Sequence, residues 1–259
     1  MRYTLLIISL LISTITSAQN TSIGTNEKLT FSASYNMSGL LTELAQVTME
    51  TSEVKTSTST LLRLKCTAAT YSKWDSFFKI RDLYESYVSP KSLRPYLYKR
   101  DINEGGYEKF MQYKFKRKTN TIESIKRKKR DDGSTWEEKK KLSISSSTKD
   151  LVSTIYAIRN LDIHKATLGD SQVFKVVFDN EEFSLNVKYL NKETISTNLG
   201  RKECYKLAIS INNSNVLTGK NDNLLWLTAD ANKIPVYAKF RIPVGNGELK
   251  IKSATGLKN

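Results

Sequence analysis

The sequence is poor in the residues that form covalent frameworks and many catalytic centres. Its 259 residues include two cysteines, one histidine and four prolines. Two cysteines exclude a disulfide scaffold and a four-thiolate zinc site, and a single histidine excludes a metal site built from several histidines. A chain of this length buries enough surface to be stable without such links. Because 39% of its residues are hydrophobic and 10% are aromatic, we predict a globular fold rather than a disordered chain.

The motifs of nucleophilic catalysis and phosphate binding are also absent. A Ser-His-Asp triad would have to use His164, and no G-x-S-x-G sequence supplies its serine. No glycine-rich phosphate-binding loop is present. Two carboxylates could form the acid–base pair of a glycosidase if folding placed them about 5–9 Å apart. The candidates for such a pair are Asp82, Glu85, Glu104 and Asp230.

Asp230 has a simpler interpretation. It lies in the segment from Thr228 to Lys233, between two predicted strands, where a carboxylate accepts hydrogen bonds from the backbone of a turn. We expect this structural role. We predict that the protein is not an enzyme and that it carries no metal or cofactor.

The N-terminal segment has the pattern of a secretory signal peptide. Arg2 precedes the apolar run from Leu5 to Ile12, and small residues occupy positions 16–18. The run is shorter than the ~20 residues that span a bilayer, and no later segment is a transmembrane candidate. We expect residues 1–18 to be removed. The remainder, 19–259, should then form one exported domain in the periplasm or at the outer envelope.

The chain is strongly basic. Its 41 Lys and Arg residues exceed its 26 Asp and Glu residues, and the formal net charge is +15. The excess is greatest in the run Lys126, Arg127, Lys128, Lys129 and Arg130, which follows Lys114, Lys116, Arg117 and Lys118. One interpretation is a solvated strand edge that resists aggregation. The other is a site for an anionic envelope component, such as lipopolysaccharide or an acidic phospholipid. Export makes nucleic acid an unsuitable partner.

Most of the chain alternates with a period of two residues, which is typical of half-buried strands. Leu29, Phe31, Ala33 and Tyr35, for example, share one face. The best helical segment runs from Thr148 to Asn160, with Thr148 as its expected N-cap. About a dozen strands and one good helix predict a mainly β fold. It should be a strongly curved antiparallel sheet or a partly closed β-barrel with one or two packed helices.

Short polar segments predict the turns that separate these strands. The clearest are Glu104-Gly105-Gly106, Thr119-Asn120, Asp131 to Ser134, Asp179-Asn180 and Val244 to Gly247, with a longer polar loop from Asn212 to Asn223.

The two thiols differ in their surroundings. Cys66 shares a strand face with Leu62 and Leu64, whereas Cys204 lies with Lys202 and Lys206. An exported protein can form a disulfide, but this mismatch favours two unpaired thiols. A bridge and a catalytic cysteine are the alternatives.

Large aromatic residues are the candidates for contact with a ligand. Trp74, Phe77 and Phe78 form a cluster in sequence, and Trp136 and Trp226 lie on separate predicted strands. Core packing is the ordinary explanation of such residues. The sharper hypothesis is that these five side chains line a concave ligand site.

A series of short motifs resembles the Domain of Unknown Function 3108 family of exported bacterial proteins. The motifs are Glu27 to Phe31, Gly39, Phe78 to Asp82, Glu85 to Tyr87, Leu93 to Pro95, Lys149 to Leu151, Tyr156 to Arg159, Leu190 to Ile195, Trp226 to Asp230 and Ile234 to Val236. Their order over nearly all of residues 19–259 is the specific feature. The resemblance implies an envelope protein of Bacteroidetes-type bacteria. It supplies no catalytic residue, because the family has no established activity.

Three functional hypotheses follow. The first is a non-catalytic binding or carrier module for an apolar or amphiphilic envelope molecule, such as a lipid. The second is a scaffold that binds an envelope partner through a sheet edge or the basic face. The third is a carboxylate-based hydrolase that acts on acidic glycans.

Overall fold

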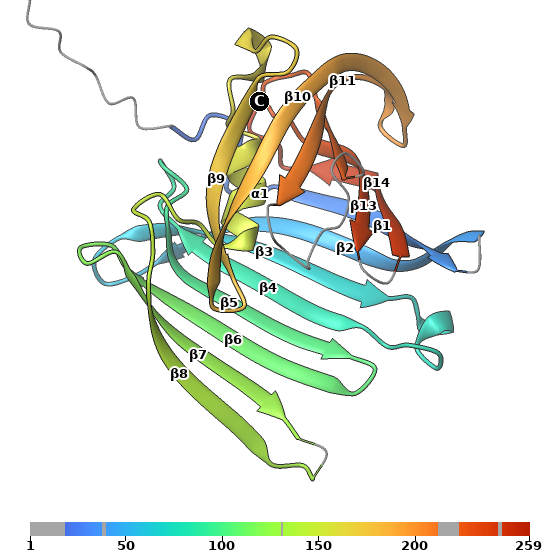
Figure 1. The fold of residues 1–259 in the computed structure, drawn as a ribbon. Helices are drawn as coiled ribbons and strands as arrows, with labels where there is room; N and C mark the ends of the chain where they lie inside the picture. The colour runs from blue at the N-terminus through green and yellow to red at the C-terminus, as the bar shows by residue number, and fades with distance from the viewer. Residues whose placement is uncertain (1–18, 38–39, 131, 212–222, 243–244) are drawn as a thin grey trace, which may run out of the picture.

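The computed structural model describes residues 19–259 except 38–39, 131, 212–222 and 243–244. The described residues form one antiparallel sheet of fourteen strands in the order β8-β7-β6-β5-β4-β3-β2-β1-β14-β13-β12-β11-β10-β9 (Figure 1). The predicted mainly β fold with a strongly curved sheet is therefore confirmed. The strands are β1 (Lys28–Met37), β2 (Leu40–Lys55), β3 (Thr60–Thr70), β4 (Arg81–Val88), β5 (Pro95–Glu104), β6 (Tyr107–Lys116), β7 (Thr121–Lys129), β8 (Thr135–Ser143), β9 (Ser171–Phe178), β10 (Glu181–Thr197), β11 (Gly200–Ile211), β12 (Leu224–Thr228), β13 (Pro235–Ile242) and β14 (Gly245–Thr255).

Among the described residues, the sheet curls around one α-helix and does not close into a barrel. Its edge strands are β8 and β9, which do not pair with each other. Helix α1 (Leu151–Ile158) lies inside the curve and contacts β3, β4 and β9 (Figure 1). The segment between β8 and α1 partly covers the β9 edge, where Lys149 forms a parallel bridge with Val176. The helix therefore fills part of the interior of the curved sheet.

Helix α1 begins later than the sequence pattern predicts. Asp150, rather than Thr148, is the N-cap, and it accepts a hydrogen bond of 2.8 Å from the backbone N–H of Ser153. The Ser153 hydroxyl accepts a 3.2 Å bond from the Asp150 N–H, which completes a capping box. The Ser86 hydroxyl on β4 donates a hydrogen bond of 2.6 Å to the other Asp150 carboxylate oxygen. Thr148 instead closes the turn that precedes the helix, since both its hydroxyl and its backbone N–H donate to the Ser145 carbonyl, at 2.8 and 3.1 Å.

The apolar core has two parts. The larger cluster joins buried side chains of β1 to β7 to those of α1, β9 and β11 to β14, including Leu29, Phe31, Tyr156, Trp226 and Ile251. The smaller cluster lies between β9 to β12 and the end of the helix, around Leu207. Alternation explains the first cluster, since Leu29 and Phe31 share the face of β1 that the sequence assigned to the core.

The tip of the β9–β10 hairpin contacts β5 and β6, which lie near the other edge of the sheet. Asp179 and Asn180 have φ values of 48° and 72°, which suit the two-residue turn predicted there. The Asn180 N–H donates to the Tyr113 hydroxyl of β6 at 2.9 Å, and the Asp179 carboxylate binds Arg100 of β5 and Lys109 of β6. The hairpin tip therefore spans the open side of the curve.

Several remaining predictions concern boundaries. β14 begins at Gly245, so most of the predicted turn over 244–247 belongs to a strand. The predicted signal peptide, residues 1–18, and most of the loop 212–223 lie outside the described residues. The 3-10 turn η1 (Ser72–Trp74) follows β3, and a second one, η2 (Ile163–Lys165), follows α1. Across the described ranges, no helix is long and apolar enough to cross a bilayer.

Candidate functional site

A cleft of about 450 Å³ lies between the tip of the β10–β11 hairpin and strands β12 to β14. We call it the Trp226 cleft. Its apolar wall consists of Ile195, Val236 and Ile251, and its aromatic wall consists of Trp226 and Tyr237. Residues 196–198 and Lys250 complete the lining. A volume of a few hundred Å³ with mostly apolar walls is typical of small-molecule sites.

An irregularity in strand pairing produces the aromatic wall. The register between β12 and β13 shifts between Trp226 and Leu227, so that Trp226 pairs with Tyr237 while Leu227 pairs with Pro235. Such a bulge twists the strands and redirects side chains. The centroids of the Trp226 and Tyr237 rings are 4.8 Å apart, with their planes inclined at 33°. On the other side, Leu227 is fully buried in the smaller core cluster, which fixes the strand.

The polar atoms of the two rings already have partners. The Trp226 Nε1–H donates to Glu193 Oε1 at 2.6 Å, and this bond is the main reason that the pKa of Glu193 is below its ordinary value. Burial and a hydrogen bond with Glu248 raise the pKa of Tyr237. The cleft therefore presents ring faces and aliphatic groups, because the indole N–H and the phenol are engaged outside it.

Lysines surround these rings. The Nζ atoms of Lys206, Lys239 and Lys250 lie 5.2 to 5.7 Å from the centroid of Trp226 or Tyr237. An ammonium group at this distance from an aromatic face is attracted by the ring quadrupole. Each lysine also pairs with a carboxylate, Lys206 with Glu193 at 3.5 Å, and Lys239 and Lys250 with Glu248 at 3.7 and 3.3 Å. The cleft thus combines an apolar interior with a margin of three lysines and two carboxylates, and the small net positive charge suits a molecule with an apolar part and an anionic group.

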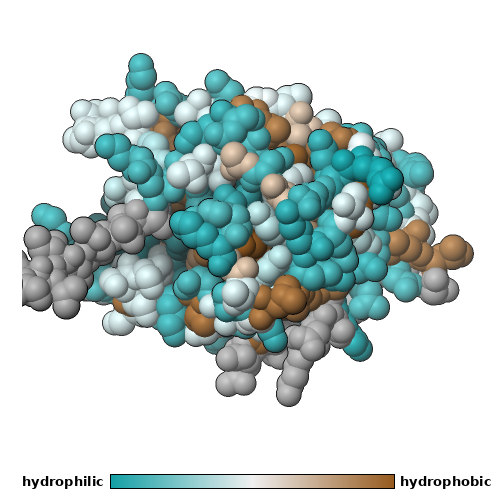
Figure 2. Space-filling view, turned by 90° about the horizontal axis from the view of Figure 1, so that it is seen from above, coloured by the Kyte–Doolittle hydropathy of each residue, from teal (hydrophilic) through white to brown (hydrophobic). Residues whose placement is uncertain are grey.

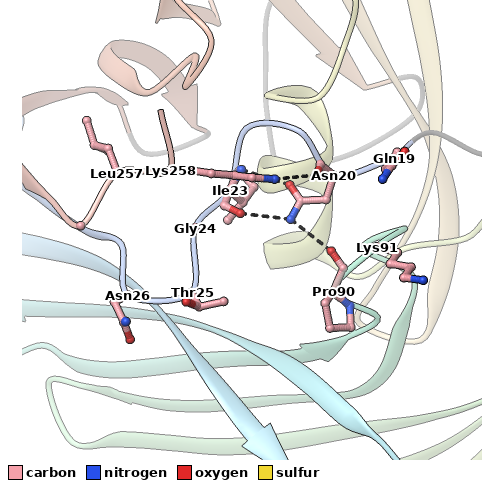
Figure 3. Close-up of a pocket in the computed structure, with 11 residues that line it drawn as sticks. Gln19, Asn20, Ile23, Gly24, Thr25, Asn26, Pro90, Lys91, Leu257 and Lys258 are labelled. Atoms are coloured by element: carbon pink, nitrogen blue, oxygen red, sulfur yellow. Dashed lines mark hydrogen bonds between the residues drawn. The ribbon is translucent and has the colours of Figure 1, made fainter.

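A larger cavity of about 600 Å³ lies between the start and the end of the described chain (Figure 3). Its principal polar side chains bind neighbouring backbone. Asn20 donates to the carbonyls of Ile23 and Pro90 at 3.1 Å each, and Lys258 Nζ donates to the Asn20 carbonyl at 2.9 Å. These bonds connect Asn20 and Lys258 to each other and to the β4–β5 loop. The polar side chains of this cavity therefore have protein partners and need no ligand.

The structure separates the five aromatic residues that the sequence proposed as ligand-lining. Of these, Trp226 lines the Trp226 cleft, but it is only 5% exposed and also belongs to the larger core cluster. Trp74, Phe77 and Phe78 lie in the loop between β3 and β4, where Phe77 is 71% exposed. Trp136 lies on the edge strand β8 beside Lys128, Lys129 and Arg130. No sequence pattern links Trp226 to the other lining residues Val236, Tyr237 and Ile251. They meet only through the strand bulge and the curvature of the sheet.

The basic run does not form one continuous face. It occupies β7 and its end, so its side chains alternate between the two faces of the sheet. Arg127 binds Glu137 at 2.5 Å, and Lys129 binds Glu108 at 3.0 Å. On the other face, Lys126 and Lys128 lie 5.8 and 5.1 Å from the ring centroids of Trp136 and Tyr107. Part of the positive charge is thus neutralised within the sheet.

Of the four candidate carboxylates, Asp82 and Glu104 come together, whereas Glu85 and Asp230 have other partners. Glu85 binds Arg63 through that residue's Nε at 2.7 Å. Asp230 caps its turn as predicted, and its Oδ1 accepts 3.0 Å bonds from the backbone of Asn232 and Lys233. Asp82 is buried, and its neighbour Glu104 is the carboxylate that interacts with it.

The environment of Asp82 changes its protonation. Burial, together with the charge and hydrogen bond of Glu104, raises the pKa of Asp82 to about 7, although the Asn103 N–H donates to its Oδ1 at 3.0 Å. The Asp82 carboxyl is therefore partly protonated near neutral pH. His164, the other titratable candidate, is exposed on η2.

Both thiols are free, as the sequence interpretation favoured. Burial raises the pKa of Cys66 to about 12 and that of Cys204 to about 11, so both are protonated at neutral pH. No cluster of three or more His, Cys, Asp or Glu residues able to hold a metal occurs in the described part of the chain.

The fold and the cleft define a class of β-barrel-like protein in which one curled sheet surrounds a helix and carries a small aromatic cleft. Residues 30–252 match the family described as protein of unknown function DUF3108, and the chain belongs to this family. The resemblance inferred from the short motifs is therefore confirmed. No curated protein matches the chain.

Two solved structures are similar to this one. A β-barrel-like protein of the domain of unknown function DUF1849 from Brucella abortus gives a TM-score of 0.53 at 6% identity, with 89% of this chain and 97% of that chain covered. This likeness supports the fold alone. A Bacteroides fragilis protein with a YmcC-like fold gives a TM-score of 0.33 at 8% identity, over 89% of this chain and 95% of the other.

Proposed function

We propose that this protein is a non-catalytic binding or carrier module for an amphiphilic molecule of the bacterial envelope, held in the Trp226 cleft. The observation that carries the proposal is the pairing of the Trp226 and Tyr237 rings, with their polar atoms already bonded, inside a cleft of about 450 Å³. An apolar chain fits the ring faces and the aliphatic wall. An anionic group fits the margin at Lys250.

The envelope location rests on the sequence. The pattern of residues 1–18 predicts export, which places the cleft among lipids and lipopolysaccharide. The net charge of +15 supports an anionic rather than a cationic ligand.

The proposal is tested with two probes that share a twelve-carbon chain, anionic dodecyl phosphate and neutral dodecyl maltoside, by isothermal titration calorimetry. Lys250→Glu should weaken dodecyl phosphate binding about tenfold and leave dodecyl maltoside nearly unchanged, because one charge at the margin is reversed. Ile195→Ser should weaken both probes, because it removes part of the apolar wall. Lys118→Glu, at the distant β6–β7 turn, is the matched charge control.

Native mass spectrometry of protein purified from its own host gives a second, independent measurement. A co-purifying amphiphile that the Ile195→Ser variant loses would support the cleft. The proposal is wrong if neither probe binds and no adduct is found, or if Lys118→Glu and Lys250→Glu have equal effects.

A further inference from the structure

We infer that the hairpin tips at one end of the sheet form a surface that binds an anionic lipid bilayer. This hairpin rim consists of Leu40, Leu41, Phe77, Phe78 and Tyr107, together with Lys73, Lys79 and Lys128. The inference goes beyond the proposed cleft and does not depend on it.

The rim gathers a large share of the exposed apolar side chains. Leu40 is 75% exposed, Phe77 is 71% exposed, and Leu41, Phe78 and Tyr107 are each 41–46% exposed. These residues come from three hairpins that are distant in sequence and adjacent in the sheet. Exposed large apolar groups that recur at one end of a protein mark an interaction surface.

Direct contacts place these tips next to one another. The Trp74 Nε1–H of the β3–β4 loop donates to the Glu43 carbonyl near the start of β2, at 3.1 Å. The Gly105 N–H of the β5–β6 turn donates to the Lys79 carbonyl at 2.8 Å, and Gly105 lies directly against the Phe78 ring. Figure 1 shows the tips of the β1–β2, β3–β4 and β5–β6 hairpins at the same end of the sheet. Figure 2 shows hydrophobic surface at the end of the molecule where the β1–β2 hairpin extends.

The β3–β4 loop holds its phenylalanines outward in an ordered turn. The backbone N–H groups of Phe77 and Phe78 both donate to the Trp74 carbonyl, at 3.0 and 2.9 Å. Asp75 fixes the same turn, since its carboxylate accepts bonds of 2.6 Å from Thr70 and from Arg81. A glycine is required at position 105, because φ is +55° and a Cβ would lie 2.6 Å from the Phe78 ring. The exposure of Phe77 is therefore built into the turn.

The charge around these side chains selects the partner. Within the described residues, Lys73, Lys79 and Lys128 form no ion pair, and the carboxylate of this turn, Asp75, is neutralised by Arg81. Lys73 and Lys128 lie beside the Trp74 and Tyr107 rings, at 5.7 and 5.1 Å from their centroids. Aromatic and aliphatic side chains flanked by free lysines are the composition that binds anionic membrane interfaces. Separate projecting tips also suit insertion between lipid head groups better than a flat contact with a protein.

The test is co-flotation of the full chain with vesicles of phosphatidylglycerol and phosphatidylethanolamine, compared with phosphatidylcholine vesicles. We expect binding to the anionic vesicles that falls as salt is raised. The double variant Leu40→Ser/Phe77→Ser should reduce partitioning about tenfold or more. Leu168→Ser is the matched control, since Leu168 is also 71% exposed but lies between η2 and β9. Wild type and every variant are expressed with the same residues 1–18 and compared in the exported form, from which we expect that segment to be removed.

Two further variants test whether lysine charge contributes to vesicle binding and whether the Trp226 cleft is involved. Lys73→Gln/Lys79→Gln should weaken binding to anionic vesicles several-fold, whereas Lys118→Gln should not. Lys250→Glu should leave vesicle binding intact, so failure of the cleft proposal is distinguishable from failure of this one. The inference is overturned if the wild-type chain does not bind anionic vesicles, or if Leu40→Ser/Phe77→Ser binds them as well as Leu168→Ser does. Loss of a concentration-dependent dimer in the double variant, with vesicle binding unchanged, would identify a second copy of the chain as the partner instead.

Discussion

Arg159 and Glu27 form an ion pair in which both side chains are completely buried. Arg159, just beyond α1, donates from Nη1 and Nη2 to the two oxygens of Glu27, at 2.5 and 2.7 Å. The same guanidinium donates to the backbone carbonyl of Asn232 at 3.0 Å. The Arg159 side chain therefore connects the end of the helix to Glu27, which precedes β1, and to the β12–β13 loop. These segments lie far apart in sequence.

Loss of one partner of this pair should be strongly destabilising. Arg159→Met leaves the Glu27 carboxylate buried without its partner, and we expect it to lower the free energy of unfolding by about 3–5 kcal/mol. Urea denaturation followed by circular dichroism measures the change.

The double variant Arg159→Met/Glu27→Met is the control for that effect. It should recover a large part of the loss, because no charge is then left unpaired. A double variant that is less stable than either single variant would show that the bonds to backbone carbonyls, rather than the ion pair, hold the helix.

The carboxyl of Asp82 should make stability depend on pH in an unusual direction. Burial raises its pKa to about 7 in the folded state, above the ordinary value of 3.8. The folded protein therefore holds this proton more tightly than the unfolded chain, so the contribution is largest below pH 4 and is lost as pH rises to 7. Asp82→Asn should be more stable than the wild type at pH 8, by about 2 kcal/mol, with no gain at pH 4. Urea titrations at both pH values test this, and an equal difference at the two values would contradict it.

The contact between Asp179 and Arg100 should hold the β9–β10 hairpin against the sheet. Arg100 is 5% exposed, and its guanidinium also stacks on the Phe178 ring at 4.3 Å. Asp179→Asn keeps a residue that tolerates the positive φ but removes the charge that pairs with Arg100 and Lys109. We expect a loss of about 2 kcal/mol and faster proteolysis at residues 178–181. Asp170→Asn, in the exposed loop before β9, is a control that should have little effect.

The two cysteines should be unreactive in the folded protein. Their raised pKa values leave almost no thiolate at pH 8. Iodoacetamide should label neither residue in the native state and both in guanidinium chloride, as measured by intact-protein mass spectrometry. Rapid native labelling would show that one thiol is accessible, and a peptide linking Cys66 to Cys204 would show that a bridge forms.

Local sequence patterns predicted much of the fold. Alternation identified the core face of β1, and the dipeptide Asp179-Asn180 identified a turn whose positive φ values suit those residue types. The role of Asp230 was predictable for the same reason, since its hydrogen bonds reach only two and three residues along the chain. The N-cap was misplaced by two residues, because Thr148 bonds back to Ser145 while Asp150 forms the local capping box with Ser153. Only the added bond from Ser86, 64 residues from Asp150, required the tertiary structure.

The sequence by itself determined the strands, the hairpin turns, the helix and the family, because each of these depends on the chemistry of residues close together in the chain. Tertiary structure alone decided which side chains meet. The bulge at Trp226 sets its ring against Tyr237, the curled β10–β11 hairpin brings Ile195 to the same cleft, and sheet order gathers Leu40, Phe77 and Tyr107 at one end. The physical reason is that strand order, register shifts and sheet curvature follow from packing around α1, and packing energy is summed over the whole molecule rather than encoded at any one position.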